Sequence, residues 1–326
     1  MKKNILVAGC GYWGKNLVRN FYEINSLYAV CDPNEELANK FSNEYDVKSL
    51  SFNDILLNNE IEGVVLAVPA PLHAKMAIDA LNSNKHVYVE KPLAMNQDEA
   101  FEMIKIAKKN EMQMMVGHLL QYHPVFIKLR EMVKNDFIGK LDYVYSNRLS
   151  FGKLRSEEDV IWSFAPHDIS MILSLVSTDH VTVRAESSSI IQDDIADKSI
   201  IHLNFCNGLK SHIFVSWLHP HKEHKLVAIG KQGMLVFDDS KPWSEKLSYY
   251  NHKVDISSSP ELLKSELEYI DVSESEPLKN ECKHFKDIVN KNIKPFTDGL
   301  EGLNVLNVLS AASESLEKNM SIKVNL

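Results

Sequence analysis

The sequence predicts a protein of the α/β plus α+β class, with an N-terminal parallel sheet and a C-terminal open, mostly antiparallel sheet. Through residue 116, short apolar strand patterns alternate with helical patterns, and such alternation produces a parallel sheet with helices on both faces. After Gly117 the chain changes to successive β-rich runs separated by polar turns, which is typical of antiparallel sheets. We therefore expect one domain over residues 1–119 and a second over residues 120–326.

Hydrophobic periodicity places the elements of both domains. In the first domain we expect strands at 4–8, 27–31, 63–68, 86–89 and 113–116, and helices at 12–22, 34–41, 71–81 and from the Asn96–Glu99 capping pair to 108. In the second domain we expect strands at 141–150, 181–190, 199–205, 212–217, 225–229 and 234–237, and helices at 122–133, 167–175, 281–289 and 300–316. The β-rich runs do not alternate cleanly enough to identify a buried sheet face.

Length and composition limit the classes of protein to which the chain can belong. Its 326 residues exceed the about 250–300 that one core usually supports, and 44% hydrophobic residues are typical of globular proteins. The net charge of −8 argues against a nucleic-acid partner, and no apolar run approaches the about 18 residues that span a bilayer. The short apolar runs predict no membrane partner. The four cysteines form no Cys-x-x-Cys pair, which argues against a structural zinc, and such scattered thiols predict a cytoplasmic protein.

Glycines mark the first strand-to-helix connection. Gly9-Cys10-Gly11-Tyr12-Trp13-Gly14 is a G-x-G-x-x-G motif that follows a strand and opens a helix. The first glycine permits the tight turn, the second lets the backbone approach a pyrophosphate, and the third lets the helix pack on the strand. The helix N-terminus offers N–H groups to the phosphates. The motif predicts a dinucleotide-binding Rossmann domain, in which Tyr12 and Trp13 contact the cofactor or pack the loop.

Asp32 indicates which dinucleotide is bound. It ends the second predicted strand, 18 positions after Gly14, where an acid binds the ribose hydroxyls of NAD. Its carboxylate would repel the 2′-phosphate of NADP, and no arginine stands beside it. The alternative is that Asp32 only caps the following helix. Together with the glycine motif, it predicts NAD rather than NADP as the cofactor.

A lysine follows the fourth long strand of the first domain. Val87-Tyr88-Val89-Glu90-Lys91-Pro92 places Lys91 at the carboxyl end of that strand, the edge where ligands of open α/β sheets bind. By itself such a lysine is usually a solvated surface residue. Here, however, several motifs resemble in order and spacing those of the glucose–fructose oxidoreductase/inositol dehydrogenase (Gfo/Idh/MocA) family. They are the glycine loop, Val68-Pro69-Ala70-Pro71-Leu72-His73, Glu90-Lys91-Pro92, Ala165-Pro166-His167-Asp168-Ile169, Glu281-Cys282-Lys283-His284-Phe285 and Thr297-Asp298-Gly299.

The resemblance implies a Rossmann domain, a sheet domain that holds the substrate, and sugar or polyol oxidation with NAD or NADP. It implies that Lys91 and His167 are the catalytic residues. It also implies cofactor contacts from Val68, Pro69, His73, Glu90 and Lys91. The family often has an aspartate four residues before the histidine, where this chain has Ser163. A Lys–Asp–His relay is therefore in question, and Asp168 is expected to support His167 rather than to replace the missing acid.

These residue types suit hydride transfer from a sugar carbon to nicotinamide. A histidine with an ordinary pKa near 6.5 can remove the hydroxyl proton at neutral pH. A lysine ammonium group can hydrogen-bond the same oxygen and stabilise the developing alkoxide. The cofactor carries the redox step. Without the family pattern, His167 would be read as a core histidine that begins a buried helix.

Basic and aromatic residues of the second domain indicate the substrate. Arg148, Lys153 and Arg155 can bind a diphosphate or a carboxylate, and Trp162 can stack on a sugar or a base. The alternative is a solvated basic turn with a core tryptophan. This region resembles the family branch that oxidises the 3-hydroxyl of nucleotide-activated amino sugars, such as UDP-N-acetylglucosamine or its uronate. The expected substrate-binding residues are Lys91, Arg148, Lys153, Trp162, Ser163, His167 and Asp168, and the alternative substrate is a free polyol such as inositol.

Three further hypotheses follow from the second domain. His219-Pro220-His221-Lys222-Glu223-His224 has the residue types of a zinc site, but Pro220 favours a polar loop between two strands, so we expect no metal. Ser163 in place of the aspartate favours, against Lys91 and His167, a non-catalytic dinucleotide-binding regulator. An open sheet leaves one face uncovered, and members of the family often pair there, so a homodimer or homotetramer is expected.

Overall fold

The computed structural model describes residues 2–152, 154–156, 158–255 and 261–326 and divides into two compact units. Unit 1 comprises Met1–Tyr122 and Ser275–Leu306, and unit 2 comprises His123–Glu274 and Asn307–Leu326. Neither unit is one continuous stretch, whereas the sequence suggested two consecutive segments, 1–119 and 120–326. Residues 275–306 return to unit 1 because their apolar side chains are buried there.

Unit 1 is built on a parallel sheet with strand order β3-β2-β1-β4-β5-β6. Its strands are β1 (Ile5–Ala8), β2 (Leu27–Cys31), β3 (Lys48–Ser49), β4 (Gly63–Leu66), β5 (His86–Glu90) and β6 (Met114–Gly117). The strands β1, β4 and β6 are buried along their whole length, as strands covered on both faces must be. This confirms the predicted parallel sheet.

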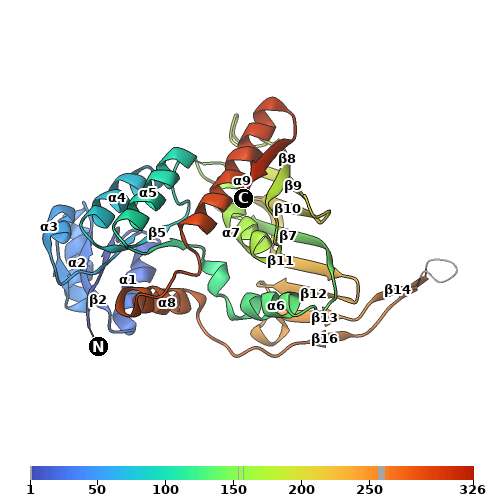
Figure 1. Ribbon diagram of the computed structural model, residues 1–326, viewed down its shortest axis with the longest axis horizontal. Coiled ribbons are helices and arrows are strands. Elements are labelled where there is room, and N and C mark those ends of the chain that lie inside the picture. The colour runs from blue at the N-terminus through green and yellow to red at the C-terminus, as the bar shows by residue number, and fades with distance from the viewer. Residues whose placement is uncertain (1, 153, 157, 256–260) are drawn as a thin grey trace. The chain divides into compact units, whose positions relative to one another are not determined.

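Helices cover both faces of this sheet (Figure 1). They are α1 (Gly14–Glu23), α2 (Glu35–Tyr45), α3 (Phe52–Leu57), α4 (His73–Asn82), α5 (Gln97–Lys109), α8 (Pro277–Lys291) and the start of α9 (Gly299–Lys318), with short 3₁₀ turns η1 (Ala70–Leu72) and η2 (Leu119–Tyr122). Helix α4 packs against α5, and α1 packs against α8. Phe21 of α1, Phe285 of α8 and Tyr88 of β5 meet in one fully buried aromatic cluster. Helix α8, which lies late in the chain, thus completes the core of the N-terminal sheet.

The caps of the unit 1 helices follow the sequence signals. Asn96 precedes α5 and its side chain accepts the N–H of Glu99, as predicted. The Glu99 carboxylate returns to the backbone N–H of Met95, one residue before the expected partner. The short elements β3 and α3 were not predicted, because two and six residues are too few to show a period.

Unit 2 contains a mixed, mostly antiparallel sheet with strand order β16-β13-β12-β11-β7-β10-β9-β8-β17. Its strands are β7 (Leu141–Phe151), β8 (His180–Ser188), β9 (Lys198–Phe205), β10 (Lys210–Ser216), β11 (Leu218–Gly230), β12 (Gly233–Asp238), β13 (Leu247–Tyr250), β16 (Leu267–Tyr269) and β17 (Ile322–Asn325), and β14 (Lys253–Asp255) pairs separately with β15 (Glu261–Leu263). Among the described strands of the large sheet, β7 and β10 run parallel and the other neighbours pair antiparallel. The predicted open, mostly antiparallel sheet is confirmed.

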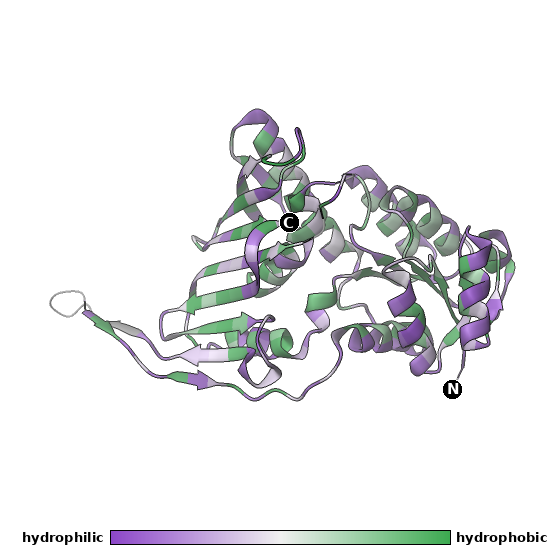
Figure 2. Ribbon diagram, turned by 180° about the vertical axis from the view of Figure 1, so that it is seen from behind, coloured by the Kyte–Doolittle hydropathy of each residue, from purple (hydrophilic) through white to green (hydrophobic). Residues whose placement is uncertain are grey.

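One face of this sheet is covered by helices. Helices α6 (Pro124–Lys134) and α7 (Val160–Leu175) pack on it, while a 3₁₀ turn, η3 (Trp243–Glu245), joins β12 to β13. Side chains alternate along β9, where Ile201 and Leu203 are buried and His202 and Asn204 are exposed. Figure 2 shows strands of this sheet banded in both hydropathy colours. The alternation is therefore clearer than the sequence suggested.

Two elements of unit 2 differ from their predictions. Helix α7 begins at Val160, seven residues before the expected start, and Pro166 lies inside it. Asp159 caps the helix by accepting the N–H of Trp162 at 3.0 Å, and burial of the apolar first turns outweighs the proline. The segment 219–224 lies within β11 rather than in a loop, although its pairing with β7 is irregular between Leu218 and Glu223.

Among the described residues, no helix is long and apolar enough to cross a membrane.

Candidate functional site

The glycine loop of unit 1 has the geometry that its motif predicts. Gly9 has a φ of +92°, and a Cβ there would lie 2.3 Å from the carbonyl oxygen of Ala67. A Cβ on Gly14 would lie 1.8 Å from the carbonyl oxygen of Gly9, so only glycine lets α1 begin this close to β1. At Gly11, by contrast, a Cβ would meet nothing within 4 Å. The loop is therefore tight on its protein side and open at its second glycine.

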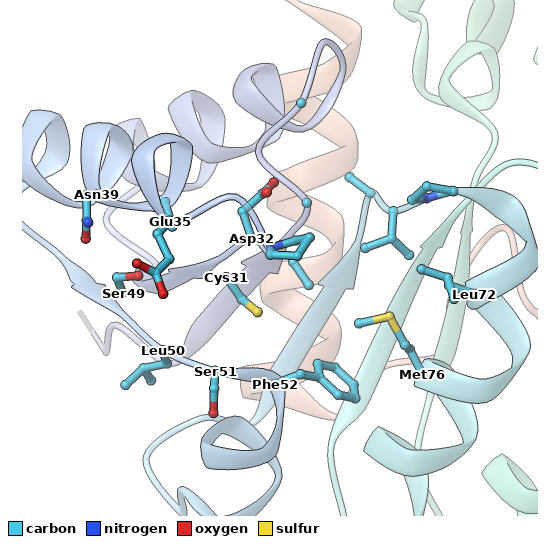
Figure 3. Close-up of a pocket in the computed structure, with 18 residues that line it drawn as sticks. Cys31, Asp32, Glu35, Asn39, Ser49, Leu50, Ser51, Phe52, Leu72 and Met76 are labelled. Atoms are coloured by element: carbon cyan, nitrogen blue, oxygen red, sulfur yellow. The ribbon is translucent and has the colours of Figure 1, made fainter.

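A cavity of about 830 Å³ adjoins this loop at the carboxyl ends of β1, β2 and β4 (Figure 3). Its position is the one at which open α/β sheets bind ligands. Its size suits a nucleotide. The residues that line it are Ala8, Gly9, Gly11, Cys31, Asp32, Pro33, Glu35, Ala38, Asn39, Ser49, Leu50, Ser51, Phe52, Ala67, Val68, Pro69, Leu72 and Met76. The sequence did not predict the lining residues from α2, β3 and α3; β3 and α3 were not predicted as elements, and the helix predicted at 34–41 was not assigned to the site.

The carboxylate of Asp32 is held in place by the backbone. Its Oδ2 accepts the N–H of Cys10 at 2.7 Å, and its Oδ1 accepts the N–H of Asn34 at 2.9 Å. Glu35, in the first turn of α2, lines the same cavity, and the lining contains no lysine or arginine among the described residues. The cavity is therefore electronegative where β2 ends. Asn34, not Asp32, caps α2 by accepting the N–H of Leu37, so the capping role considered for Asp32 falls to its neighbour.

The other predicted cofactor residues divide into two groups. Val68 and Pro69 line the cavity, and Tyr12 is 88% exposed at the open side of the loop. His73 is buried and does not line it. Its Nδ1 lies 2.7 Å from the carbonyl oxygen of Pro92 and its Nε2 lies 2.9 Å from that of Val68. His73 thus braces the loop after β4 against the segment that follows β5.

Trp13 and Glu90 connect the glycine loop to the Glu90-Lys91-Pro92 motif. The indole Nε1–H of Trp13 donates to Oε1 of Glu90 at 2.7 Å. The hydroxyl of Tyr88 donates to the same oxygen at 3.0 Å. Burial raises the pKa of Glu90, while these two bonds and the neighbouring Lys91 ammonium oppose the rise. Lys91 itself follows β5 directly, and its peptide bond to Pro92 is cis.

Buried polar residues that follow β6 were not predicted from the sequence. His118 is 2% exposed, and its Nδ1 lies 2.6 Å from Oε2 of Glu301. The hydroxyl of Tyr122 lies 3.0 Å from that of Thr297, which donates to the carbonyl oxygen of Val116. The sequence contained one signal, the Thr297-Asp298-Gly299 motif, but it gave no contact partner.

In unit 2, α7 carries the predicted catalytic histidine. His167 is half-buried in the middle of α7, and Ser163 lies one helical turn before it. Residues four apart lie on one helix face, so an acid at position 163 would stand beside His167. Trp162 donates its indole N–H to the hydroxyl of Ser313 on α9 at 3.1 Å. That contact leaves the half-buried ring, rather than its nitrogen, for stacking.

Arg148 and Asp168 form a buried ion pair between β7 and α7. The Nε of Arg148 donates to Oδ2 of Asp168 at 2.6 Å, and its Nη2 donates to Oδ1 at 3.2 Å. Asp168 also accepts the hydroxyl of Ser146. The carboxylate of Asp168 therefore fixes α7 to β7 of the sheet, one residue after His167. Lys153, predicted to bind substrate, lies outside the described residues.

The three histidines of β11 do not form a metal site in the structure described. Among the described residues, no group of three or more His, Cys, Asp or Glu side chains is arranged to hold a metal ion. His219 and His221 contact each other edge to face, with ring centroids 4.5 Å apart. His224 instead points to Arg148, with its Nδ1 3.5 Å from Nη1. Burial, and then the Arg148 charge, lower the pKa of His224 to about 3.

Comparison with protein families decides the classification. Residues 3–118 match a family described as an oxidoreductase family with an NAD-binding Rossmann fold, and residues 126–236 match the GFO/IDH/MocA C-terminal domain. The chain belongs to the Gfo/Idh/MocA family. This Gfo/Idh/MocA protein is therefore an oxidoreductase, and its first sheet is an NAD-binding domain.

Curated relatives and solved structures match most of the chain at low identity. The UDP-N-acetylglucosamine 3-dehydrogenase of Acidithiobacillus ferrooxidans is 25% identical over 92% of each chain, and its solved structure matches 98% of this chain with a TM-score of 0.85. The inositol 2-dehydrogenase of Salmonella typhimurium is 24% identical over 70% of this chain and 71% of its own. The structure of GenD2 from gentamicin A biosynthesis, in complex with NAD, covers 100% of this chain and 97% of its own at 18% identity, with a TM-score of 0.82.

Proposed function

We propose that the chain is an NAD-dependent dehydrogenase that oxidises a hydroxyl group, the 3-hydroxyl, of a nucleotide-activated amino sugar such as UDP-N-acetylglucosamine or its uronate. Such a reaction belongs to the biosynthesis of surface-polysaccharide or lipid sugars. The cavity at the open glycine loop is the observation that carries the dinucleotide part of the proposal. The similarity to a UDP-N-acetylglucosamine 3-dehydrogenase over 92% of the chain supports the substrate.

The cavity favours NAD over NADP. Asp32 and Glu35 place two carboxylates in its lining, and no lysine or arginine is among the described lining residues. A 2′-phosphate would lie against this negative charge without a cation to pair with it. The chain's own residues thus fit an adenosine ribose with free hydroxyls, and Gly11 leaves room for a pyrophosphate.

The proposed chemistry assigns one role to each of two side chains. His167 takes the proton of the sugar hydroxyl as general base. The Lys91 ammonium group hydrogen-bonds the same oxygen and stabilises its developing negative charge. When bound, NAD would supply the acceptor for the hydride that leaves the sugar carbon. Ser163 cannot hold a proton as a carboxylate does, so His167 acts without an acid from that position.

The substrate residues proposed in unit 2 are Arg148, Trp162 and Ser163, with Lys153 outside the described structure. Arg148 uses Nε and Nη2 on Asp168, and its Nη1 faces Nδ1 of His224 at 3.5 Å. Each of the two Nη atoms carries a second N–H, and these are the donors that we propose for a diphosphate or carboxylate. Asp168 holds Arg148 rather than the sugar. The half-buried ring of Trp162 offers a stacking surface.

The substrate test follows NADH absorbance with UDP-N-acetylglucosamine, its uronate and myo-inositol. We expect turnover with a nucleotide sugar and none with inositol. Turnover of inositol alone would reject the proposal in favour of a free-polyol dehydrogenase, which the 24% identity to an inositol 2-dehydrogenase favours as the second candidate. Metal analysis after dialysis tests the expected absence of zinc.

His167→Ala and Lys91→Met test the catalytic roles. We expect turnover to fall by about 10²–10⁴-fold for His167→Ala, the usual contribution of a general base, while NAD still binds. His221→Ala, at an exposed position of β11, is the matched control and should keep full turnover. Unchanged turnover in His167→Ala would contradict the role, and absence of turnover with every sugar would favour a regulator.

We also propose a cytoplasmic homodimer or homotetramer. The face of the large sheet that carries Tyr143, Tyr145, His202 and His212 is not covered by α6 or α7. Sedimentation that gives a monomer at micromolar concentration would refute the assembly.

A further inference from the structure

A buried pair of carboxyl groups lies in the core of unit 1, and the proposed reaction does not use it. The pair consists of Glu90, from the motif at the end of β5, and Glu281, from helix α8. Tyr88 lies between them: its hydroxyl donates to Glu90, and its ring packs against Phe285, one turn further along α8 from Glu281. Both Glu90 and Tyr88 are near enough to affect the pKa of Glu281. Two acidic groups that share one tyrosine in a dry core cannot both be charged at low cost.

Glu90 has the contacts of an ionised carboxylate. Its Oε1 accepts two donors, the indole N–H of Trp13 and the hydroxyl of Tyr88. A Cβ at Gly117 would lie 2.9 Å from Cδ and Oε2 of Glu90, so the backbone of β6 packs directly on the carboxyl group. The positive charge of the neighbouring Lys91 ammonium group also favours the ionised form, because it lowers the pKa of Glu90. An ionised carboxylate is an acceptor only, which fits this donor set.

Glu281 has the opposite surroundings. It is completely buried, and neither carboxyl oxygen makes a hydrogen bond to any described residue within ordinary geometry. Burial, and then the Glu90 charge, raise the pKa of Glu281 well above its usual value, and the nearby Tyr88 hydroxyl only partly opposes this. Burial, and then charge on Glu281, raise the pKa of Tyr88 and of Tyr122. Because the one hydroxyl proton of Tyr88 already serves Glu90, charge on Glu281 would have no donor to stabilise it.

We infer that Glu281 is a neutral carboxylic acid that positions Glu90: it retains the one proton of the pair, so that Glu90 stays ionised and keeps Trp13 and the glycine loop in place. The inference rests on the proposed function only for its link to NAD binding. Glu281 is a positioning residue, because it touches neither the cavity lining nor Lys91 in any contact described.

Other titratable groups around the pair have partners of their own. Glu301 is bonded to His118, and Arg19 of α1 is paired with Glu276 at the start of α8. The Cys282 thiol is fully buried, and its pKa is raised by burial and then by Glu281. The remaining neighbours are Lys91 and the two tyrosines. Ionisation of Glu281 at alkaline pH would therefore place a second negative charge near Glu90, and we expect it to weaken the Trp13 contact and NAD binding.

Glu281→Gln tests this positioning role, because an amide keeps the shape and the neutrality of the acid but cannot ionise. Asp287→Asn, on the exposed side of the same helix, is the matched control. NAD binding to the full-length chain is titrated by fluorescence from neutral to alkaline pH. We expect wild type and Asp287→Asn to lose affinity several-fold as pH rises, and Glu281→Gln to bind within about twofold of wild type at neutral pH and to lose the alkaline decline.

A second measurement does not depend on the cofactor. In D₂O, the infrared carbonyl band of a protonated carboxylic acid should be present in wild type and absent from Glu281→Gln. If wild type binds no NAD but the band behaves as expected, the proposed function fails while the neutral acid stands. The inference is overturned if the band is the same in both proteins, or if Glu281→Gln shows the wild-type alkaline decline. Loss of folding or of neutral-pH affinity in Glu281→Gln would also overturn it, because that variant changes no charge.

Discussion

Single side chains set the electrostatic character of the cofactor cavity and of the sheet beside His167. Asp32 is fixed by two backbone N–H groups, so its charge cannot swing away from an incoming phosphate. Glu35 is exposed and less constrained. Although both acids line the cavity, Asp32 therefore contributes a negative charge at a fixed position, whereas the charge of Glu35 can move.

Asp32→Ala should shift the preference from NAD toward NADP. Removing a fixed carboxylate takes away both the ribose contact and the repulsion of a 2′-phosphate, so we expect the ratio of kcat/KM for NAD over NADP to fall at least about tenfold, which corresponds to about 1.4 kcal/mol. Initial rates with both cofactors measure the ratio. Glu35→Gln is the control and should change it less. An unchanged ratio in Asp32→Ala would show that the acid does not select the cofactor.

His224 should make the protein sensitive to mild acid. Its pKa is about 3 in the folded chain, whereas a histidine in the unfolded chain has an ordinary pKa near 6.5. Its contribution to stability is therefore complete above about pH 6.5 and is lost as pH falls toward 3, by at most about 1.4 kcal/mol per pH unit. The physical cause is burial beside Arg148.

His224→Asn removes this proton-binding site from the unfolded chain. Urea unfolding of wild type and variant at pH 8 and pH 5 gives the comparison. We expect the variant to be the less stable protein at pH 8, because packing is lost, and the difference to shrink or reverse at pH 5. An equal difference at both pH values would rule out His224 as a source of the acid sensitivity.

The role of a residue could be predicted from the sequence where the local backbone geometry accepts only that residue type. Gly9 and Gly14 are such positions, because any side chain there would meet backbone atoms. The sequence did not predict the Trp13–Glu90 contact or the pairing of Glu90 with Glu281, since the residues of each pair are far apart in the chain and meet only after folding. Glu281 was identified as part of a family motif, but the residues next to it in the sequence did not indicate that it would be fully buried.

Helices and strands were predictable where an apolar period was long and its ends were marked. Strand β2 was predicted at its observed bounds, and the Asn96 cap of α5 was identified correctly. Helix α7 was not: it was expected to begin at His167, whereas the burial of Val160, Ile161 and Ala165 extends it back through Pro166 to Val160. Tertiary packing thus overrode a local signal.

Asp159→Ala should destabilise α7. The side chain of Asp159 accepts the N–H of Trp162, and loss of such a cap costs about 1 kcal/mol. Urea unfolding of the full-length chain measures the loss. Asp159→Asn keeps an oxygen acceptor and is the control, so it should remain close to wild type. Equal losses in both variants would mean that the charge, and not the cap, is what matters.

At the scale of the whole molecule, unit 1 depends on two separate chain segments. The first segment supplies the sheet, and the second supplies α8, whose Cys282, Phe285 and Ile288 are completely buried in the unit 1 core. Asn280 bonds to the carbonyl oxygen of Tyr122 and to the hydroxyl of Ser275, so the two segments meet where a short linker can join them.

Residues 1–122 alone should therefore fail to fold cooperatively, because the α8-facing side of the sheet would be exposed. A linked fragment that joins 1–122 to 275–306 through a short Gly/Ser linker should regain cooperative thermal unfolding. Circular dichroism of both fragments measures this. Cooperative unfolding of the shorter fragment at the same temperature as the linked one would contradict the role of α8.

The chain passes between the two units three times, at 122/123, 274/275 and 306/307. A gene fusion or recombination event with one breakpoint after the sixth strand would transplant the sheet of unit 1 without its last helices. A working hybrid with another member of the family would have to inherit both ancestral pieces from the same parent. Because unit 1 is made of two separate segments, it cannot be exchanged between proteins as one continuous piece of the gene. We therefore expect α8 and the glycine loop to have been inherited together.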